Sequence, residues 1–278
     1  MKRHRGVRGR GLVGLVTAAC IIVATARSSA AAPPDARDAA SIYDVSPWVD
    51  GAVIVGANAV TVGFYAFGNG LIEVKCPCDP ASVNSFDRKA IGNHSDLAYD
   101  IGTATVGLSL VAPVALDVWD LRRFRPVLED VLVYGEALSL SGAFLTIAKF
   151  STSRPFPRTY EGTDPNLVRD ERGYRSFYSG HTALTFTALS AASITIARRY
   201  DHWVVPWVVT AVVGSSVAVE MVAAGWHFPT DTMAGALFGT AVGVVVPVLH
   251  FSKLPVRPTV TVNPGGDGPA LALVGTWR

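Results

Sequence analysis

The chain contains little charge. Only 17% of its 278 residues are Asp, Glu, Lys or Arg, and the formal net charge is +2. Its basic residues are scattered among loops and do not form the positive face that binds phosphate backbones, so we expect no nucleic-acid partner. Apolar residues are abundant instead, at 50% of the chain. This composition is richer in apolar residues than an ordinary soluble domain and predicts a membrane-embedded protein.

Cysteine is also scarce, with 3 residues in the chain. Cys76 and Cys78 are separated by a single proline, a spacing too short for an unstrained disulfide. Without other cysteines or a nearby histidine, the pair is a weak metal signal. We therefore predict no metal site and expect a local structural role for the pair, with an oxidised pair in an exported loop as the alternative.

The first residues resemble an export signal. A basic head up to Arg10 is followed by an apolar stretch over 11–24 and by small residues over 28–32. This three-part pattern is typical of a secretory signal, and an uncleaved anchor helix is the alternative. The sequence thus predicts a signal or anchor over 1–32, followed by a polar extracytoplasmic segment over 33–50.

Apolar runs recur through the rest of the chain, several of them close to the roughly 20 residues that cross a bilayer. We predict one all-α domain over 51–252, a polytopic, membrane-embedded bundle of about six helices. The expected helices cover 51–72, 97–116, 127–150, 180–198, 203–225 and 229–250. In the tail, 253–278, alternating residues flank a Pro/Gly-rich turn, which predicts a small β-hairpin.

The arginines between the predicted helices bear on orientation. They lie in two loops, after the second and the fourth helix: Arg122, Arg123, Arg125, Arg198 and Arg199. The positive-inside tendency places both loops in the cytoplasm and the opposite end of the bundle outside. A cleaved signal followed by six full crossings predicts the reverse. We therefore expect that the 51–72 segment does not fully cross or that the signal interpretation is wrong.

The first motif is Ser179-Gly180-His181. A loop rich in Pro and Gly precedes it and a long apolar run follows, so Ser179 is expected near a helix N-cap. The free N–H groups of a helix start attract anions, and glycine allows close approach. A phosphate fits such a site. The alternative is a plain serine cap beside a packing histidine.

The second motif runs from His227 to Asp231. Pro229 suits a first helical position and Asp231 the first turn. A carboxylate one turn from a histidine can hold one imidazole nitrogen and leave the other as a nucleophile. The alternative is a helix-start acid near an interfacial histidine.

Two cations complete the group of candidate site residues. Lys149 ends an apolar helix, and Arg154 precedes Pro155 in the loop that follows. Taken alone, Lys149 could be a cation that stabilises a helix C-terminus or reaches the membrane interface, and Arg154 could be an ordinary loop charge. Cations, helix start and histidine–carboxylate pair nevertheless occur in order, each at the end of an apolar helix. Together they indicate phosphoryl transfer through a histidine.

The region from Lys149 to about Gly239 resembles the type 2 phosphatidic acid phosphatase superfamily, which includes bacterial acid phosphatases and vanadium haloperoxidases. Its pattern is Lys-x6-Arg-Pro, then Pro-Ser-Gly-His, then Ser-Arg-x5-His-x3-Asp. The positions that match are Lys149, Ser179, Gly180, His181, His227 and Asp231.

The resemblance implies a helical bundle with the site at one end and no metal or cofactor. His227 would attack phosphorus to form a phosphohistidine, Asp231 would orient it, and His181 would protonate the leaving group. The phosphoryl oxygens would be held by Lys149, Ser179 and the backbone of Gly180.

Two arginines of the family pattern are replaced, by Phe156 and Met221. The planar fork of an arginine binds phosphate oxygens in pairs, and losing one such donor can cost on the order of a hundredfold in rate. Arg154, two residues early, is a candidate replacement that would bind phosphate. Arg158 and Arg175 are further candidates.

We therefore predict a phosphatase of a lipid phosphate, a lipid diphosphate or another phosphomonoester. It would lie among the lipids of a cell membrane, such as a bacterial inner membrane, with its site facing the periplasm or the outside. A soluble, exported nonspecific acid phosphatase is one alternative. A degenerate, non-catalytic member that binds phosphorylated headgroups or acts as a membrane scaffold is another.

Overall fold

The computed structural model describes residues 41–252, together with the backbone of 256–262 and 269–275. The predicted signal or anchor over 1–32 and the first part of the 33–50 segment lie outside the described residues.

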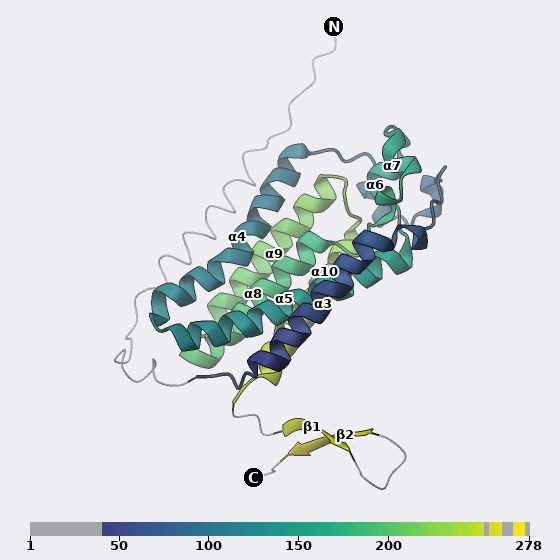
Figure 1. Cartoon of the computed structure of the whole chain (residues 1–278). Helices are drawn as coiled ribbons and strands as arrows, with labels where there is room; N and C mark the ends of the chain where they lie inside the picture. The colour runs from purple at the N-terminus through teal and green to yellow at the C-terminus, as the bar shows by residue number, and fades with distance from the viewer. Residues whose placement is uncertain (1–40, 253–255, 263–268, 276–278) are drawn as a thin grey trace.

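Six long helices run side by side and form a bundle (Figure 1). This confirms the predicted all-α architecture. They are α3 (Pro47–Phe67), α4 (Asp96–Leu121), α5 (Phe124–Thr152), α8 (Gly180–Tyr200), α9 (Val204–Ala223) and α10 (Pro229–Leu249). The first helix begins earlier than predicted because Pro47 starts it and the carboxylate of Asp50 accepts a hydrogen bond from the Ser46 N–H at 2.9 Å.

Short elements in two loops cover one end of the bundle. The loop between α3 and α4 contains η1 (Asn69–Leu71), η2 (Pro80–Ser82) and η3 (Asp87–Ala90). The loop between α5 and α8 contains α6 (Pro157–Tyr160), α7 (Pro165–Arg169) and η4 (Glu171–Tyr174). Figure 1 shows α6 and α7 beyond the ends of the long helices. We call this the capped end.

Helix α8 lies inside the bundle, where it contacts α4, α5, α9 and α10. Its buried side chains are small or carry hydroxyls, among them Thr182, Ala183, Thr185, Thr187 and Ser190. Glycines of α10 allow it to approach α8 closely, since a Cβ added at Gly239 would lie 2.3 Å from the Ala183 carbonyl oxygen. Such backbone-to-backbone packing fixes where α8 begins relative to α10.

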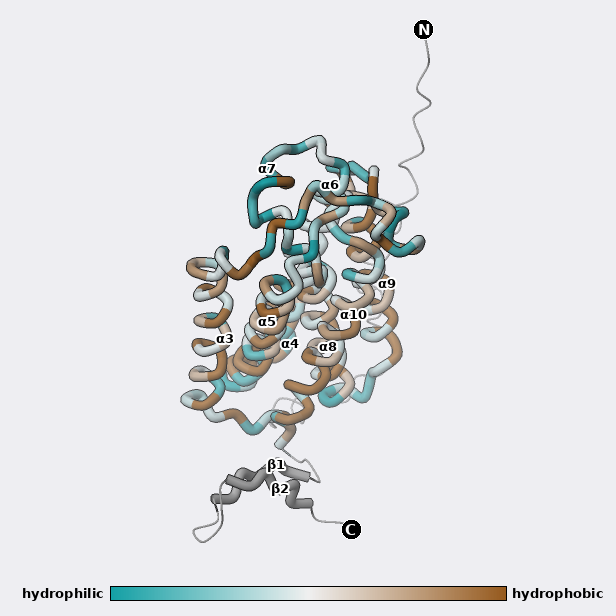
Figure 2. The backbone as a smooth tube through the Cα atoms, turned by 90° about the vertical axis from the view of Figure 1, so that its right-hand side faces the viewer, coloured by the Kyte–Doolittle hydropathy of each residue, from teal (hydrophilic) through white to brown (hydrophobic). Residues whose placement is uncertain are grey.

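Five helices, α3, α4, α5, α9 and α10, are long and apolar enough to cross a membrane. Helix α8 is not among them, which differs from the expectation of six apolar crossings. Its polar side chains are tolerated because its neighbours surround it. The outer helices expose large apolar side chains, for example Val55, Leu108, Phe144, Val208 and Leu237. In Figure 2 the long helices are mainly brown and white and the capped end is largely teal, an arrangement that suits a bilayer.

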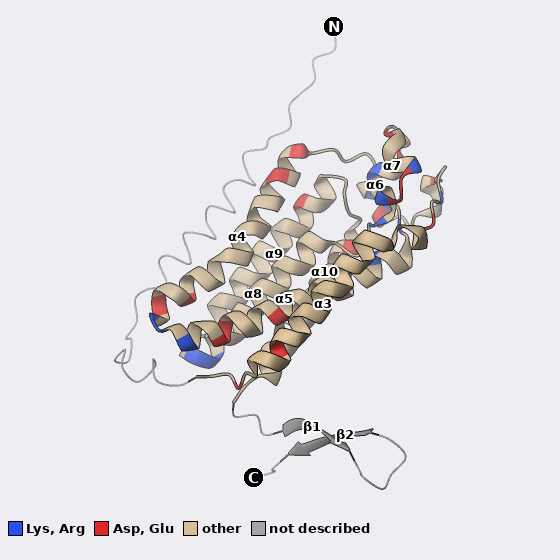
Figure 3. Cartoon of the chain, in the orientation of Figure 1, with Lys and Arg blue, Asp and Glu red and all other residues tan. Residues whose placement is uncertain are grey.

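The arginines that bear on orientation lie at the end of the bundle away from the cap. Arg122 follows α4, and Arg198 and Arg199 end α8. Figure 3 shows this blue group apart from the charges around α6 and α7. Helix α3 has 21 residues, about 30 Å of helix, and packs along α5. This length suits a full crossing.

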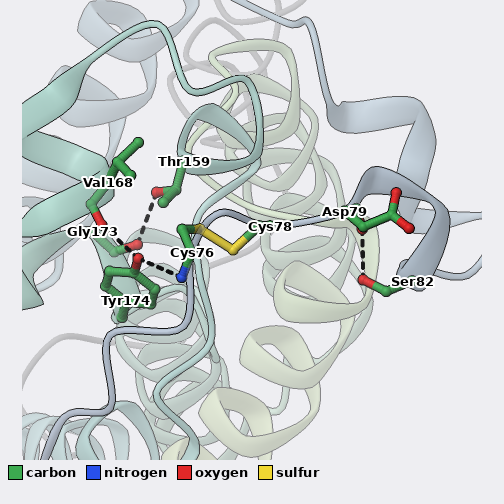
Figure 4. Close-up of a disulfide and its surroundings, with 8 residues drawn as sticks. All are labelled: Cys76, Cys78, Asp79, Ser82, Thr159, Val168, Gly173 and Tyr174. Carbon is green, nitrogen blue, oxygen red and sulfur yellow. Dashed lines mark hydrogen bonds between the residues drawn. A yellow bond between two sulfur atoms is a disulfide. The ribbon is translucent and has the colours of Figure 1, made fainter.

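Cys76 and Cys78 form a disulfide (Figure 4). The oxidised alternative is therefore the one observed, because the chain turns at Pro77 and the two Cα atoms are 4.2 Å apart. The Cys76 N–H donates to the Tyr174 hydroxyl at 3.1 Å, and this hydroxyl donates to the Val168 carbonyl at 2.6 Å. The bond between Cys76 and Tyr174 joins the two loops of the capped end.

The tail pairs as predicted. Strand β1 (Val256–Val262) runs antiparallel to β2 (Pro269–Gly275), with Val256 opposite Gly275.

Candidate active site

The predicted motifs meet at the capped end, where α5 and α9 end and α8 and α10 begin. Ser179 is the N-cap of α8, and its Oγ accepts hydrogen bonds from the N–H and the hydroxyl of Thr182 at 3.4 and 3.0 Å. The Ser179 N–H donates to the Asp231 carbonyl at 3.1 Å. Gly180 is the first residue of α8, and a Cβ there would lie 3.1 Å from Leu145. The hydroxyl of Ser179 is fully buried and acts as a cap, while the start of α8 is held against the first turn of α10.

His227 lies just before α10 and is 4% exposed. Its Nδ1 is 3.7 Å from Asp231 Oδ2, too far for a hydrogen bond, and has no hydrogen-bond partner among the described residues. Burial lowers the pKa of His227, the charge of Lys149 adds to this effect, and Asp231 opposes it. The ring is therefore neutral at neutral pH, the form in which an imidazole acts as a nucleophile.

Asp231 is fully buried and accepts hydrogen bonds on both carboxylate oxygens. Oδ2 accepts from the Ser176 hydroxyl at 2.5 Å and from the Phe228 N–H at 3.0 Å, and Oδ1 accepts from Arg154 Nη1. The bond to Phe228 also closes the N-terminal turn of α10. These donors hold the carboxylate ionised and fixed beside His227.

Arg154 faces carboxylates in this structure. In addition to Asp231, its guanidinium donates to Thr230 Oγ1 at 2.9 Å and to Asp87 Oδ2 at 2.8 Å. It also lies 4.3 Å from the centroid of the Phe228 ring. These contacts hold Arg154 against Asp231 and Asp87, and its predicted role as a direct phosphate ligand stays a prediction.

Asp87 is a component that sequence reasoning missed. It lies on η3 and is fully buried. It accepts hydrogen bonds from the Thr230 N–H at 3.0 Å, from the Thr230 hydroxyl at 2.6 Å and from Arg154. Burial acts to raise the pKa of Asp87, but the bonds from Thr230 and Arg154 outweigh it and the pKa lies below its usual value. A lone aspartate in a polar loop carries no sequence signal for this role.

The other cations also have protein partners. Lys149 is 8% exposed, and its Nζ donates to the Arg175 carbonyl at 2.5 Å and lies 6.0 Å from the Phe156 ring centroid. Arg175 donates to Asn69 Oδ1 at 2.6 Å, and Arg158 donates to the Ala224 carbonyl at 2.9 Å. Lys149 lies close enough to His227 for its charge to lower the pKa of that histidine.

Phe156 and Met221, which replace the expected arginines, occupy different surroundings. The Phe156 ring packs edge-on against His227, with centroids 5.7 Å apart, and against Trp226 at 5.4 Å. Met221 is fully buried, and its carbonyl accepts the N–H groups of Trp226 and His227 at 3.2 and 3.3 Å. An aromatic ring therefore borders the candidate nucleophile where a guanidinium was expected.

His181 lies in the first turn of α8 and is partly buried. Its Nε2 is 3.3 Å from Thr103 Oγ1, and its ring lies 5.7 Å from that of Tyr99. The Tyr99 ring lies 6.1 Å from that of Trp226, which in turn contacts Phe156. A run of aromatic rings thus connects the two histidines at the capped end.

Two histidines, an aspartate and a lysine are thus gathered at one end of a bundle of long, apolar helices. Residues 130–254 match the family model of the PAP2 superfamily, which confirms the resemblance drawn from the motifs. The matched residues include every motif position from Lys149 to Asp231.

The chain is also similar to a solved structure, described as the crystal structure of the first transmembrane PAP2 type phosphatidylglycerolphosphate phosphatase from Bacillus subtilis. The two share 15% identity with a TM-score of 0.41, over 71% of this chain and 93% of that one. No curated protein matches the chain.

Proposed function

We propose that the protein is a membrane phosphatase that hydrolyses a lipid phosphate or diphosphate through a phosphohistidine. The observation that carries this proposal is the placement of His227, buried and neutral beside the fixed carboxylate of Asp231. A neutral imidazole beside an ionised carboxylate can become positive at low cost as it forms a bond to phosphorus.

The reaction has two steps. Lys149 and the N–H groups at the start of α8 hold the phosphoryl oxygens. His227 Nε2 attacks phosphorus and the bond from phosphorus to the ester oxygen breaks. Burial lowers the pKa of His181 to about 4, but the negative charge of the bound phosphate favours its protonated form, which gives its proton to the leaving oxygen. Water then attacks the phosphohistidine, His181 takes a proton from the water, the P–N bond breaks and inorganic phosphate leaves. Asp231 stabilises the charge on His227 between the steps.

The apolar surroundings favour a lipid substrate. Phe156 and Trp226 border the histidine, and the helices that carry the site expose apolar faces. Contacts of this kind bind a hydrophobic group, while Lys149 supplies the fixed cation for the phosphate. The same exposed faces oppose the soluble acid phosphatase alternative.

The orientation follows from the arginines. Because Arg122, Arg198 and Arg199 lie at the end opposite the site, the positive-inside tendency favours a site that faces the periplasm or the outside.

A lipid panel tests the proposal. Purified protein in detergent micelles with EDTA should release inorganic phosphate from at least one of phosphatidic acid, phosphatidylglycerol phosphate and a polyprenyl diphosphate. His227→Ala should release none. His202→Ala is the matched control, since His202 is exposed in the loop between α8 and α9.

If wild type and His227→Ala release the same background from every lipid, the enzyme proposal is wrong. Binding of either protein to vesicles that contain these lipids would then support the headgroup-binding alternative.

A further inference from the structure

A second group of histidine and carboxylates lies at the other end of α10. His250 follows the last residue of this helix, Asp50 is in the first turn of α3, and Glu136 is on α5. Helix α10 has 21 residues and is about 30 Å long, so this cluster is remote from Asp231. Figure 1 shows α3 beginning and α10 ending at the same end of the bundle.

The three side chains converge on one point. His250 Nε2 lies 3.6 Å from Asp50 Oδ1 and 3.4 Å from Glu136 Oε2, and one ligand atom from each of the three residues lies within 4.8 Å of the other two. These separations are too long for good hydrogen bonds. His250 Nδ1 is 2.8 Å from the Val246 carbonyl oxygen, which can only accept a hydrogen bond. The proton therefore sits on Nδ1, and in the neutral ring the lone pair of Nε2 faces the carboxylates.

The cluster is buried and its charge is not balanced. Asp50 and Glu136 are 5% and 8% exposed, and Glu136 Oε2 has no hydrogen-bond partner among the described residues. In the part of the chain that the structure describes, both carboxylates pair with His250. With a neutral histidine the cluster carries two negative charges, and protonation of His250 leaves one. A divalent cation would neutralise both, which matters because unbalanced buried charge is costly.

We infer that Asp50, Glu136 and His250 form a binding site for a divalent transition-metal ion such as Zn²⁺. In a tetrahedral site with bonds of about 2.0–2.1 Å, neighbouring ligand atoms are about 3.3–3.4 Å apart. The separations of 3.4 and 3.6 Å fit this geometry, and one position remains for water. One imidazole with two carboxylates suits zinc-like ions better than Mg²⁺, and the Val246 carbonyl orients the imidazole as an outer partner.

Such an ion would fasten three segments. The residues before α3 already lie against the end of α10, where the Tyr43 and Phe251 rings stack at 5.7 Å and the Asp44 N–H donates to the His250 carbonyl at 2.7 Å. A metal between Asp50, Glu136 and His250 would join the start of α3 and the end of α10 to α5. Its role is structural, so the inference does not depend on the phosphatase chemistry.

Metal titration of the full chain tests the site. Protein in detergent micelles is stripped with EDTA, the chelator is removed, and Zn²⁺ is added in a calorimeter. Co²⁺ replaces Zn²⁺ in a parallel titration, because its visible absorption reports coordination number. We expect one saturable ion per chain and the absorption of four- or five-coordinate Co²⁺.

Variants distinguish this site from adventitious binding. Glu136→Gln and His250→Gln should each weaken Zn²⁺ binding at least tenfold. His94→Gln should not, although His94 also pairs with a carboxylate, that of Glu161, at the capped end. Circular dichroism checks the helix content of each variant, and Glu136→Gln decides the test if His250→Gln does not fold. Absence of saturable binding, or equal binding by wild type and Glu136→Gln, would overturn the inference.

Discussion

Helix α10 has a histidine next to each of its ends, and each histidine faces buried carboxylates. His227 Nδ1 is 3.7 Å from Asp231, and His250 Nε2 is 3.6 Å from Asp50 and 3.4 Å from Glu136. The counter-charges differ. Arg154 neutralises Asp231, whereas Asp50 and Glu136 share His250. We propose that the same two residue types form a positioned nucleophile at one end and a cation site at the other.

The largest expected effect is at the start of α10. His227→Ala should abolish phosphate release, because no other group of the site can take the place of the attacking nitrogen. The assay is the lipid panel with EDTA, with His202→Ala as control. Turnover by His227→Ala above the background of heat-denatured protein would show that His227 is not the nucleophile. The contrast between the two ends of α10 would then fail as well.

The next effect concerns Arg154, the cation that pairs with the carboxylate at the start of α10. Arg154→Ala should lower kcat at least tenfold, about 1.4 kcal/mol, because Asp231 loses its charge partner and its fixed position. Arg154→Lys should recover only part of this, since it keeps the charge without the fork. Arg172→Ala is the control, as Arg172 is exposed and pairs locally with Asp170.

Steady-state kinetics distinguishes two roles for Arg154. A loss in kcat with little change in KM indicates that it positions Asp231, while a rise in KM at constant kcat indicates direct binding of substrate. Unchanged kinetics would show that neither role is correct.

At the end of α10, the effect of Glu136→Gln on the free energy of unfolding should depend on whether Zn²⁺ is present. Without metal, Glu136→Gln removes one of two buried negative charges and should leave the free energy of unfolding unchanged or raise it. With Zn²⁺ at about 100 times its dissociation constant, the wild type should gain about 2.7 kcal/mol, and the variant, which binds at least tenfold more weakly, should gain no more than about 1.4 kcal/mol. Denaturant unfolding with EDTA and with Zn²⁺ measures this, and equal responses of the two proteins would contradict it.

The smallest effect is a displaced pH profile. An ordinary histidine has a pKa of about 6.5. Burial lowers that of His227, so the ring stays neutral below this value and activity should be lost only as the pH falls through the lowered pKa. The acidic limb of kcat/KM should therefore lie below about 6.5. A limb at or above that pH would mean that His227 is not held in the buried state described.

The helices and motif positions could be predicted because their signals are local. Apolar runs marked the long helices, Pro229 and Ser179 marked the starts of α10 and α8, and the alternation in the tail marked its hairpin. The enclosed position of α8 was not predicted, because a run of moderate hydropathy does not show whether lipid or protein surrounds it.

The supports of the site could not be predicted because they depend on distant contacts. Asp87 meets Arg154 and Thr230 only after the loop before α4 folds over the capped end. Arg154 was proposed from its spacing as a phosphate ligand, but spacing does not reveal the two carboxylates that it meets. The cluster of Asp50, Glu136 and His250 likewise joins three helices and has no sequence pattern.

The central claim is that His227 is the nucleophile, and trapping the intermediate tests it most directly. Protein is mixed briefly with a lipid substrate labelled with ³²P in the phosphoryl group, quenched in alkali, which preserves phosphohistidine, and digested for mass spectrometry. The account predicts phosphate on His227, and no labelled protein from His227→Ala. Turnover by the wild type without label on His227, or with label on another residue, would contradict it.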